Sequence, residues 1–348
     1  MATTHTIKLT SKTPLLPKEE SLECEISFAK NQPPEHLAIT SASANLTYLR
    51  GRRETAQRAQ SNQRHLCIYD RIACVQALST LVSASFFSLS INNGKDEAPL
   101  NLSGPVSEAS NTMSAFRGNN ADQRAVFAIG ASYLSPVLTF EGHGKAVFTA
   151  ASYLIGSYRS LDEISRFRLL WSGFNALYNE IAPDKKGENA HLTALADLIV
   201  TEEIQALRTK YLYEKFGSSS LLKELRWFAF ASAQLCKKGS RGVSYDKKWE
   251  VIDSSIASRL RPLAHDSKLP HGDALAKKLA LYEEQLSEPK QIAFLITWYL
   301  YYVRCSSMHG NRSYPLYSTQ YTEKALPSLC DLLEASILDI AEHLLKNA

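Results

Sequence analysis

From residue 145 to the end of the chain, apolar residues recur three and four positions apart in one segment after another. This spacing places the apolar side chains on one face of a helix, and it predicts that the region folds by packing helix against helix. The stripe is clearest in two segments, formed by Phe167, Leu170, Trp171, Phe174, Leu177 and Tyr178 and by Leu329, Leu332, Leu333, Ile337, Ile340 and Leu344. The predicted class is therefore mainly α.

Capping residues, prolines and glycines divide this region into separate helices. Ser160 and Glu163 have the spacing of a capping box, which predicts that a helix begins there and ends before Pro183. The other predicted helices are 145–158, 190–213, 219–236, 248–260, 273–286, 288–308 and 326–346. Pro327 is tolerated in the first turn of the last helix. Backbone N–H groups in a first turn have no acceptor within the helix, so the N–H that proline lacks is not needed there.

The first 140 residues differ from the rest and form a separate predicted N-terminal region. Their scattered prolines argue against a long helix near the start. A few short strands are predicted at 6–9, 24–28 and 37–40. Beyond them the pattern predicts a long helix over 53–92, a polar loop over 93–120 and a further helix over 121–134 that Pro136 breaks. Residues 145–348 are predicted to form the second domain.

Charge and composition exclude several classes of protein. A net charge of +4 is too small to indicate nucleic-acid binding by itself. The six cysteines form no CxxC pair, and His265 and His271 have no third ligand nearby, so neither a metal nor another cofactor is predicted. Neither a signal peptide nor a run of about 18 apolar residues is present, which predicts a cytoplasmic protein without a membrane span.

Arginines are concentrated around the start of the predicted 53–92 helix. They include Arg50, Arg52 and Arg53, with Glu54 as the nearby acidic residue. Such a cluster either follows the phosphates of a nucleic acid or forms a solvated helix face, and both interpretations stay open.

The segment from Trp298 to Gly310 carries the clearest chemical signal. It ends an apolar helix, presents Arg304 and His309 with four residues between them, and stops at a glycine. On an uninterrupted helix these two side chains would lie about 140° apart, so convergence requires the helix to unwind near His309. A guanidinium and an imidazole suit cleavage of RNA without metal, in which the imidazole moves a proton and the guanidinium stabilises the phosphoryl charge. The alternative is structural: Arg304 pairs with a carboxylate and His309 caps the helix.

Two segments of the chain resemble HEPN domains of the Apea-like branch. The segment from Arg168 to Tyr178 is similar to an early helix of that family, and the segment from Tyr301 to Gly310 is similar to its motif of arginine, four to six residues, histidine and glycine. The resemblance covers roughly residues 145–348.

The resemblance implies a helical bundle of HEPN type that dimerises through the motif helices. It also implies a metal-independent endoribonuclease in defence or toxin systems, with Arg304 and His309 as catalytic residues and a 2′,3′-cyclic phosphate as product end. The family often has a polar residue after the arginine, whereas this chain has Cys305, so Ser306 and Ser307 are expected to support the site with it. Arg312 is either a phosphate contact or a solvated arginine.

The expected partners are RNA, a second copy of the chain and, in a toxin-type system, an antitoxin or regulatory protein. The alternative function is a non-catalytic HEPN scaffold or sensor that binds RNA or a nucleotide. Cys305 and the low net charge favour this alternative.

Overall fold

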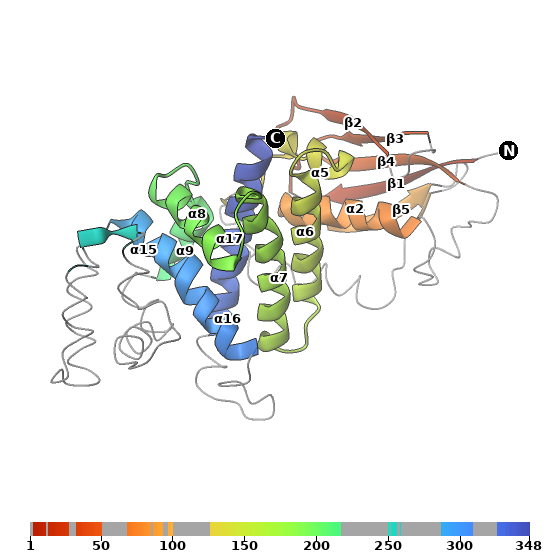
Figure 1. Cartoon of the computed structure of the whole chain (residues 1–348). Helices are drawn as coiled ribbons and strands as arrows, with labels where there is room; N and C mark the ends of the chain where they lie inside the picture. The colour runs from red at the N-terminus through yellow and green to blue at the C-terminus, as the bar shows by residue number, and fades with distance from the viewer. Residues whose placement is uncertain are drawn as a thin grey trace. The chain divides into compact units, whose positions relative to one another are not determined.

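The computed structural model describes residues 3–11, 13–27, 33–50, 68–84, 86–92, 97–99, 126–216, 250, 252–255, 258, 287–308 and 326–348. The chain divides into two compact units, which are described separately here. The first unit consists of Met1–Leu161 together with Ala341–Ala348, and the second is Asp162–Ile340. An N-terminal antiparallel sheet is thus followed by a mostly helical region (Figure 1).

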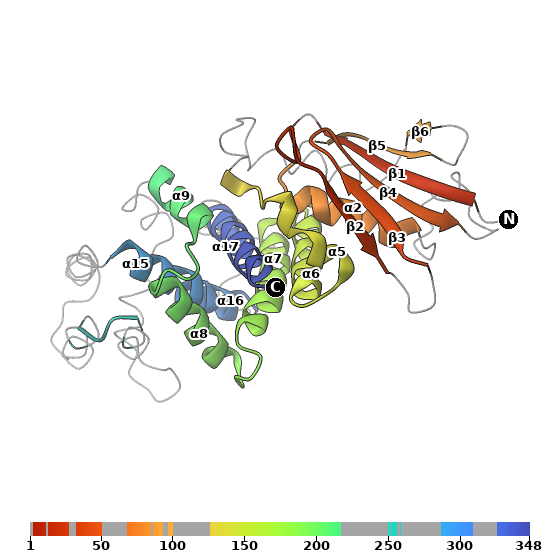
Figure 2. The same cartoon turned by 90° about the horizontal axis from the view of Figure 1, so that it is seen from above.

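The first unit is built on a sheet whose described strands run in the order β2-β3-β4-β1-β5-β6 (Figures 1 and 2). The strands are β1 (Thr3–Ser11), β2 (Leu22–Ile26), β3 (Glu35–Ile39), β4 (Ser43–Arg50), β5 (Phe86–Asn92) and β6 (Glu97–Pro99). Ile7 lies opposite both Leu46 and Ile91, and all three are buried. One face of the sheet is therefore apolar, while Thr6 and Thr47 share a hydrogen bond on the other face.

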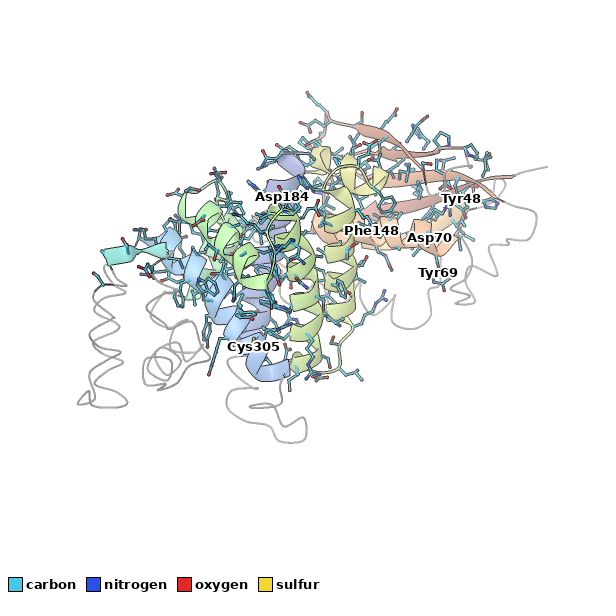
Figure 3. All side chains as sticks on the ribbon, in the orientation of Figure 1. Tyr48, Tyr69, Asp70, Phe148, Asp184 and Cys305 are labelled. Atoms are coloured by element: carbon cyan, nitrogen blue, oxygen red, sulfur yellow. The ribbon has the colours of Figure 1, made fainter. Side chains whose placement is uncertain are left out.

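Helix α2 (Ile68–Leu81) packs on β1 and β4, and it is fixed to the sheet by a buried ion pair. Arg71 donates hydrogen bonds from Nε and Nη2 to the two carboxylate oxygens of Glu35 on β3, and its guanidinium lies 5.4 Å from the centre of the Tyr48 ring. Figure 3 labels Tyr48 on the sheet and Tyr69 and Asp70 at the start of α2. The bidentate geometry compensates both charges where water is excluded.

Three further described helices complete the first unit. They are η1 (Ala131–Tyr133), α5 (Ser135–Thr139) and α6 (Gly144–Tyr158), and α6 packs along α2. Gly144 allows α6 to begin directly after α5, because a Cβ at this position would lie 1.8 Å from the carbonyl oxygen of Pro136.

The second unit is helical in its described part. Its elements are α7 (Glu163–Ile181), α8 (Glu188–Val200), α9 (Leu207–Phe216), α15 (Glu288–Phe294), the π-helical segment η2 (Leu295–Tyr299), α16 (Leu300–Met308) and α17 (Leu326–Lys346), of which the last residues belong to the first unit. Helices α7 and α15 both pack on α8, and α15, η2 and α16 follow one another without interruption.

Helix α17 carries three carboxylates into the interior, and arginines from two other helices compensate them. Arg166 on α7 lies 2.9 Å from Asp331 and 3.5 Å from Glu334. Arg208 on α9 lies 3.1 Å from Asp339, which also accepts hydrogen bonds from the first backbone N–H groups of α9. Asp339 therefore acts as both counter-ion and helix cap.

Much of the predicted secondary structure is confirmed. The apolar stripes of α7 and α17 are buried at every predicted position, and the 145–158, 288–308 and 326–346 helices appear with nearly the predicted bounds. The three predicted strands lie within or overlap β1, β2 and β3. The predicted helices over 219–236 and 273–286, and most of that over 248–260, lie outside the described residues.

Several other predictions are wrong. Residues 86–92 form β5 and not the end of the 53–92 helix, residues 97–99 of the predicted loop form β6, and the 190–213 helix is divided into α8 and α9. The chain turns at Ser83 after α2 and at Glu202 and Ala206 between α8 and α9, and these three residues have positive φ although none is glycine. Sequence rules look for glycine or proline at such breaks, so they give no warning here. The cap of α7 is Asp162 rather than Ser160, because the Asp162 side chain accepts from the Ser165 N–H.

Pro136 does not break a helix, because it lies in the first turn of α5. Within 121–134, residues 126–127 are helical, residues 128–130 are not, and 131–133 form η1. None of the described helices is both long enough and apolar enough to cross a membrane.

Asp339→Ala is expected to destabilise the protein by about 3–5 kcal/mol, because it removes a buried carboxylate that faces the buried Arg208 guanidinium. The free energy of unfolding in urea measures the effect. The double variant Arg208→Met with Asp339→Leu removes both charges, and it should be clearly more stable than Asp339→Ala. Equal stability of the two variants would contradict the proposed role of the ion pair.

Asp331 makes stability depend on pH. Burial and the neighbouring Glu334 raise its pKa to about 7, against the opposing effect of Arg166. The folded protein therefore keeps a proton that the unfolded chain releases near pH 4, so this group's contribution falls as the pH rises from about 4 to about 7. In Asp331→Asn the free energy of unfolding should change less with pH in this window, by up to about 1.4 kcal/mol per pH unit. Parallel curves for the two proteins would contradict the assignment.

Candidate functional site

Arg304 lies in the last turns of α16, and its side chain is partly exposed at 27%. The π-helical segment η2 comes directly before this helix, and all five of its residues are buried. A π segment widens the turn and changes which face the following residues occupy. The orientation of Arg304 therefore cannot be read from a regular helical wheel that starts at Glu288.

The guanidinium of Arg304 faces the carboxylate of Glu188. Arg304 Nη1 and Glu188 Oε2 are 3.7 Å apart, and the Glu188 side chain is also 27% exposed. Glu188 is the first residue of α8, and Gly187 before it has a φ of +91° that glycine adopts without strain. The turn between α7 and α8 thus brings a carboxylate to the motif arginine.

Tyr178 near the end of α7 holds the same carboxylate from the other side. Its hydroxyl donates to Glu188 Oε1 over 2.9 Å. Burial and this hydrogen bond raise the pKa of Tyr178, so the phenol keeps its proton and remains a donor at neutral pH. One hydrogen bond and one ion pair therefore connect α7, α8 and α16.

Cys305 and Tyr301 are the other described neighbours of Arg304. Arg304 Nη1 lies 3.8 Å from Cys305 Sγ, and its guanidinium lies 6.0 Å from the centre of the Tyr301 ring. Burial, followed by the charge of Cys305 and its hydrogen bond, raises the pKa of Tyr301 to about 12. The pKa of Arg304 is also raised: burial opposes this shift, and Cys305 and Glu188 outweigh burial. Figure 3 labels Cys305 on α16.

An aromatic cluster supports these residues from inside the second unit. Trp171 is buried, and its ring centre lies 6.2 Å from those of both Tyr178 and Tyr301. Trp171 is buried as its place on the apolar stripe predicts, and Trp298 is buried as well. The tyrosines of the site are thus positioned by packing.

His191 lies one turn after Glu188 on α8, but its ring is occupied. Nδ1 is 2.6 Å from Asn179 Oδ1, and Nε2 is 2.7 Å from the Lys185 carbonyl oxygen. Its ring lies 6.3 Å from that of Tyr178. Because both ring nitrogens are engaged, His191 fixes the α7–α8 turn and is not available as a general base.

Of the predicted site residues, the structure describes the side chains of Arg304 and Cys305 and brings them together. Ser306 and Ser307 continue α16, and Arg50 ends β4, but the side chains of these three lie outside the described residues. His309, Arg312, Arg52 and Arg53 lie outside them entirely. The convergence of Arg304 and His309 therefore stays a prediction.

The sequence analysis missed Glu188, Tyr178 and Tyr301 as neighbours of Arg304. Tyr178 was assigned to the apolar stripe, which is correct for its ring but overlooks its hydroxyl. In the sequence, Glu188 resembles any acidic residue in the first turn of a helix, where a negative charge is favourable. Nothing in the local sequence connects it with an arginine more than 100 residues later.

Among the described residues, no group of three or more His, Cys, Asp or Glu side chains is placed to hold a metal ion.

Tyr178→Phe is expected to lower the free energy of unfolding by about 1 kcal/mol at neutral pH, because Glu188 loses a hydrogen-bond donor. Since the pKa of Tyr178 is raised in the folded state, its contribution is lost as the pH rises above about 10, so the deficit of the variant should shrink there. Urea denaturation at neutral pH and above pH 10 measures both effects. Tyr153→Phe, at an exposed tyrosine of α6, is the control and should change little. An unchanged stability of Tyr178→Phe at neutral pH would contradict this role.

Comparison of the chain with protein-family models, with curated proteins and with solved structures found no match. The resemblance to HEPN domains therefore depends on the segments Arg168–Tyr178 and Tyr301–Gly310.

Proposed function

We propose that the protein is a metal-independent endoribonuclease of HEPN type that acts as a homodimer. The observation that carries the proposal is that Arg304, in the motif at the end of α16, already holds an oxyanion, the carboxylate of Glu188. The phosphodiester of RNA offers oxygens of the same charge to the same guanidinium.

In the proposed reaction, an imidazole takes the proton of a ribose 2′-hydroxyl, and that oxygen attacks the adjacent phosphorus. The bond to the 5′-oxygen breaks, and this oxygen receives a proton. Arg304 stabilises the negative charge that grows on the phosphoryl oxygens. His309 serves as acid or base, and the second copy of the site in a dimer supplies the other proton transfer. The products are a 2′,3′-cyclic phosphate and a 5′-hydroxyl.

Cleavage of a labelled oligoribonucleotide in the presence of chelator tests the proposal. Arg304→Ala should reduce the rate by about 100- to 1000-fold, because it removes the charge that stabilises the transition state. His309→Ala should reduce it by about 100-fold or more. Arg304→Lys should restore only part of the activity, because an ammonium group lacks the paired donors of a guanidinium.

Lys145→Ala is the matched control, because it removes a positive charge from an exposed position on α6. It should leave the rate unchanged. A substrate with 2′-deoxyribose at the cleaved position should resist cleavage. Full activity of His309→Ala, loss of activity on adding chelator, or an active protein that light scattering shows to be strictly monomeric would each contradict the proposed mechanism.

The second candidate is a non-catalytic module that binds RNA or a nucleotide. The presence of Cys305, a weak hydrogen-bonding group, beside the guanidinium favours it. Binding of RNA without cleavage, unchanged by His309→Ala, would support this candidate over the nuclease.

A further inference from the structure

We infer that Glu188 is a built-in competitor for the phosphate site of Arg304. In the RNA-free protein its carboxylate occupies the place beside the guanidinium that a phosphate of RNA takes on binding. This inference rests on the proposed function, since it names the device that sets the affinity of the same site.

The contact between Glu188 and Arg304 is loose enough to be exchanged. Their 3.7 Å separation exceeds the roughly 2.7–2.9 Å of a charge-assisted hydrogen bond. Both side chains are 27% exposed, so water and dissolved anions reach the pair. Breaking an exposed ion pair of this kind changes the equilibrium constant for binding by about fivefold or less. A phosphate that makes shorter contacts to Arg304 therefore displaces it at little cost.

Glu188 is also held independently of Arg304. The Tyr178 hydroxyl donates to its other oxygen over 2.9 Å, and its position at the start of α8 is favourable for a carboxylate. When Arg304 turns to a phosphate, Glu188 keeps these two interactions. The arginine is thus the exchangeable partner, and the glutamate is the fixed one.

The fixed carboxylate acts on RNA in two ways. Its ion pair with Arg304 must break before a phosphate binds, and its negative charge repels that phosphate. The carboxylate of Glu188 offsets the charge of Arg304, so a neutral side chain in its place would leave more of this positive charge for a phosphate. Removing the charge of Glu188 should therefore tighten binding, although Glu188 lies in direct contact with the site.

The experiment compares Glu188→Gln with wild type for binding of a fluorescent 2′-O-methyl oligoribonucleotide, which cannot be cleaved by 2′-hydroxyl attack. Glutamine keeps an acceptor for the Tyr178 hydroxyl and removes the charge. The Kd should fall by about two- to fivefold. The plot of log affinity against log salt concentration should become steeper, by up to about 0.7 in slope. The reason is that Arg304, no longer paired with a carboxylate, makes one more complete phosphate contact.

Two controls isolate the contact. Glu203→Gln removes an exposed carboxylate beyond the other end of α8, about 20 Å along the helix, and should leave the Kd unchanged. In an Arg304→Ala background, Glu188→Gln should produce no further tightening, because the site for which it competes is gone. Circular dichroism verifies folding. If Glu188→Gln is unfolded, Glu188→Ser removes the same charge with a residue suited to helix starts, and the same result is expected.

An unchanged or raised Kd in folded Glu188→Gln would overturn the inference, and a raised Kd would identify Glu188 as a residue that positions Arg304. Failure of wild type and variant to bind the oligonucleotide would overturn it as well. The outcome is distinguishable from that of the proposed function, because binding of an uncleavable ligand does not depend on cleavage. Tightening by Glu188→Gln in a protein that cuts no RNA would support the inference and reject the nuclease.

Discussion

The second unit depends on the compensation of the carboxylates that α17 carries into the interior. Arg166 of α7 forms ion pairs with Asp331 and Glu334, and Arg208 of α9 forms an ion pair with Asp339. A buried carboxylate without a partner would cost several kcal/mol, so α17 can be buried only where these arginines reach it. The ion pairs therefore determine where α7 and α9 lie along α17, beyond what non-directional apolar packing specifies.

The site around Arg304 is built on the same frame. Helix α7, fixed by Arg166, ends with the buried Tyr178, whose hydroxyl meets Glu188 at the start of α8. Glu188 in turn faces Arg304 on α16. Tyr178 and the neighbouring Trp171 are buried, while the side chains of Arg304 and Glu188 are partly exposed. Glu188 is therefore held in place, while its contact with Arg304 can be exchanged.

The role of an arginine that is paired with a carboxylate depends on how short and how buried the pair is. A tightly buried pair would be structural, as Arg208 and Asp339 are. The Arg304 pair differs from it because it is longer and several times more exposed. In our proposal this contact is a resting state from which Arg304 turns to a phosphate.

The helices that apolar periodicity predicts best are those whose stripes are buried in the second unit. The stripes of α7 and α17 and the continuous helix ending at Met308 follow from the spacing of their apolar residues. Periodicity failed at Phe86–Asn92, where apolar residues fit both a helix and a strand. The chain turns before this strand at Ser83, which has a φ of 51° and is not glycine. Pairing with β1 then decides in favour of the strand.

By itself, the sequence determined the helical character of the second unit, several short strands of the first and the spacing of Arg304, His309 and Gly310. The tertiary structure decided that residues 86–92 and 97–99 form strands of the sheet, that Glu188 faces Arg304 and that Tyr178 donates to Glu188. The physical reason is one of range. Apolar spacing acts within a helix or strand and is visible in a short window, whereas the partner of a charged or polar group is chosen by packing between segments far apart in the chain.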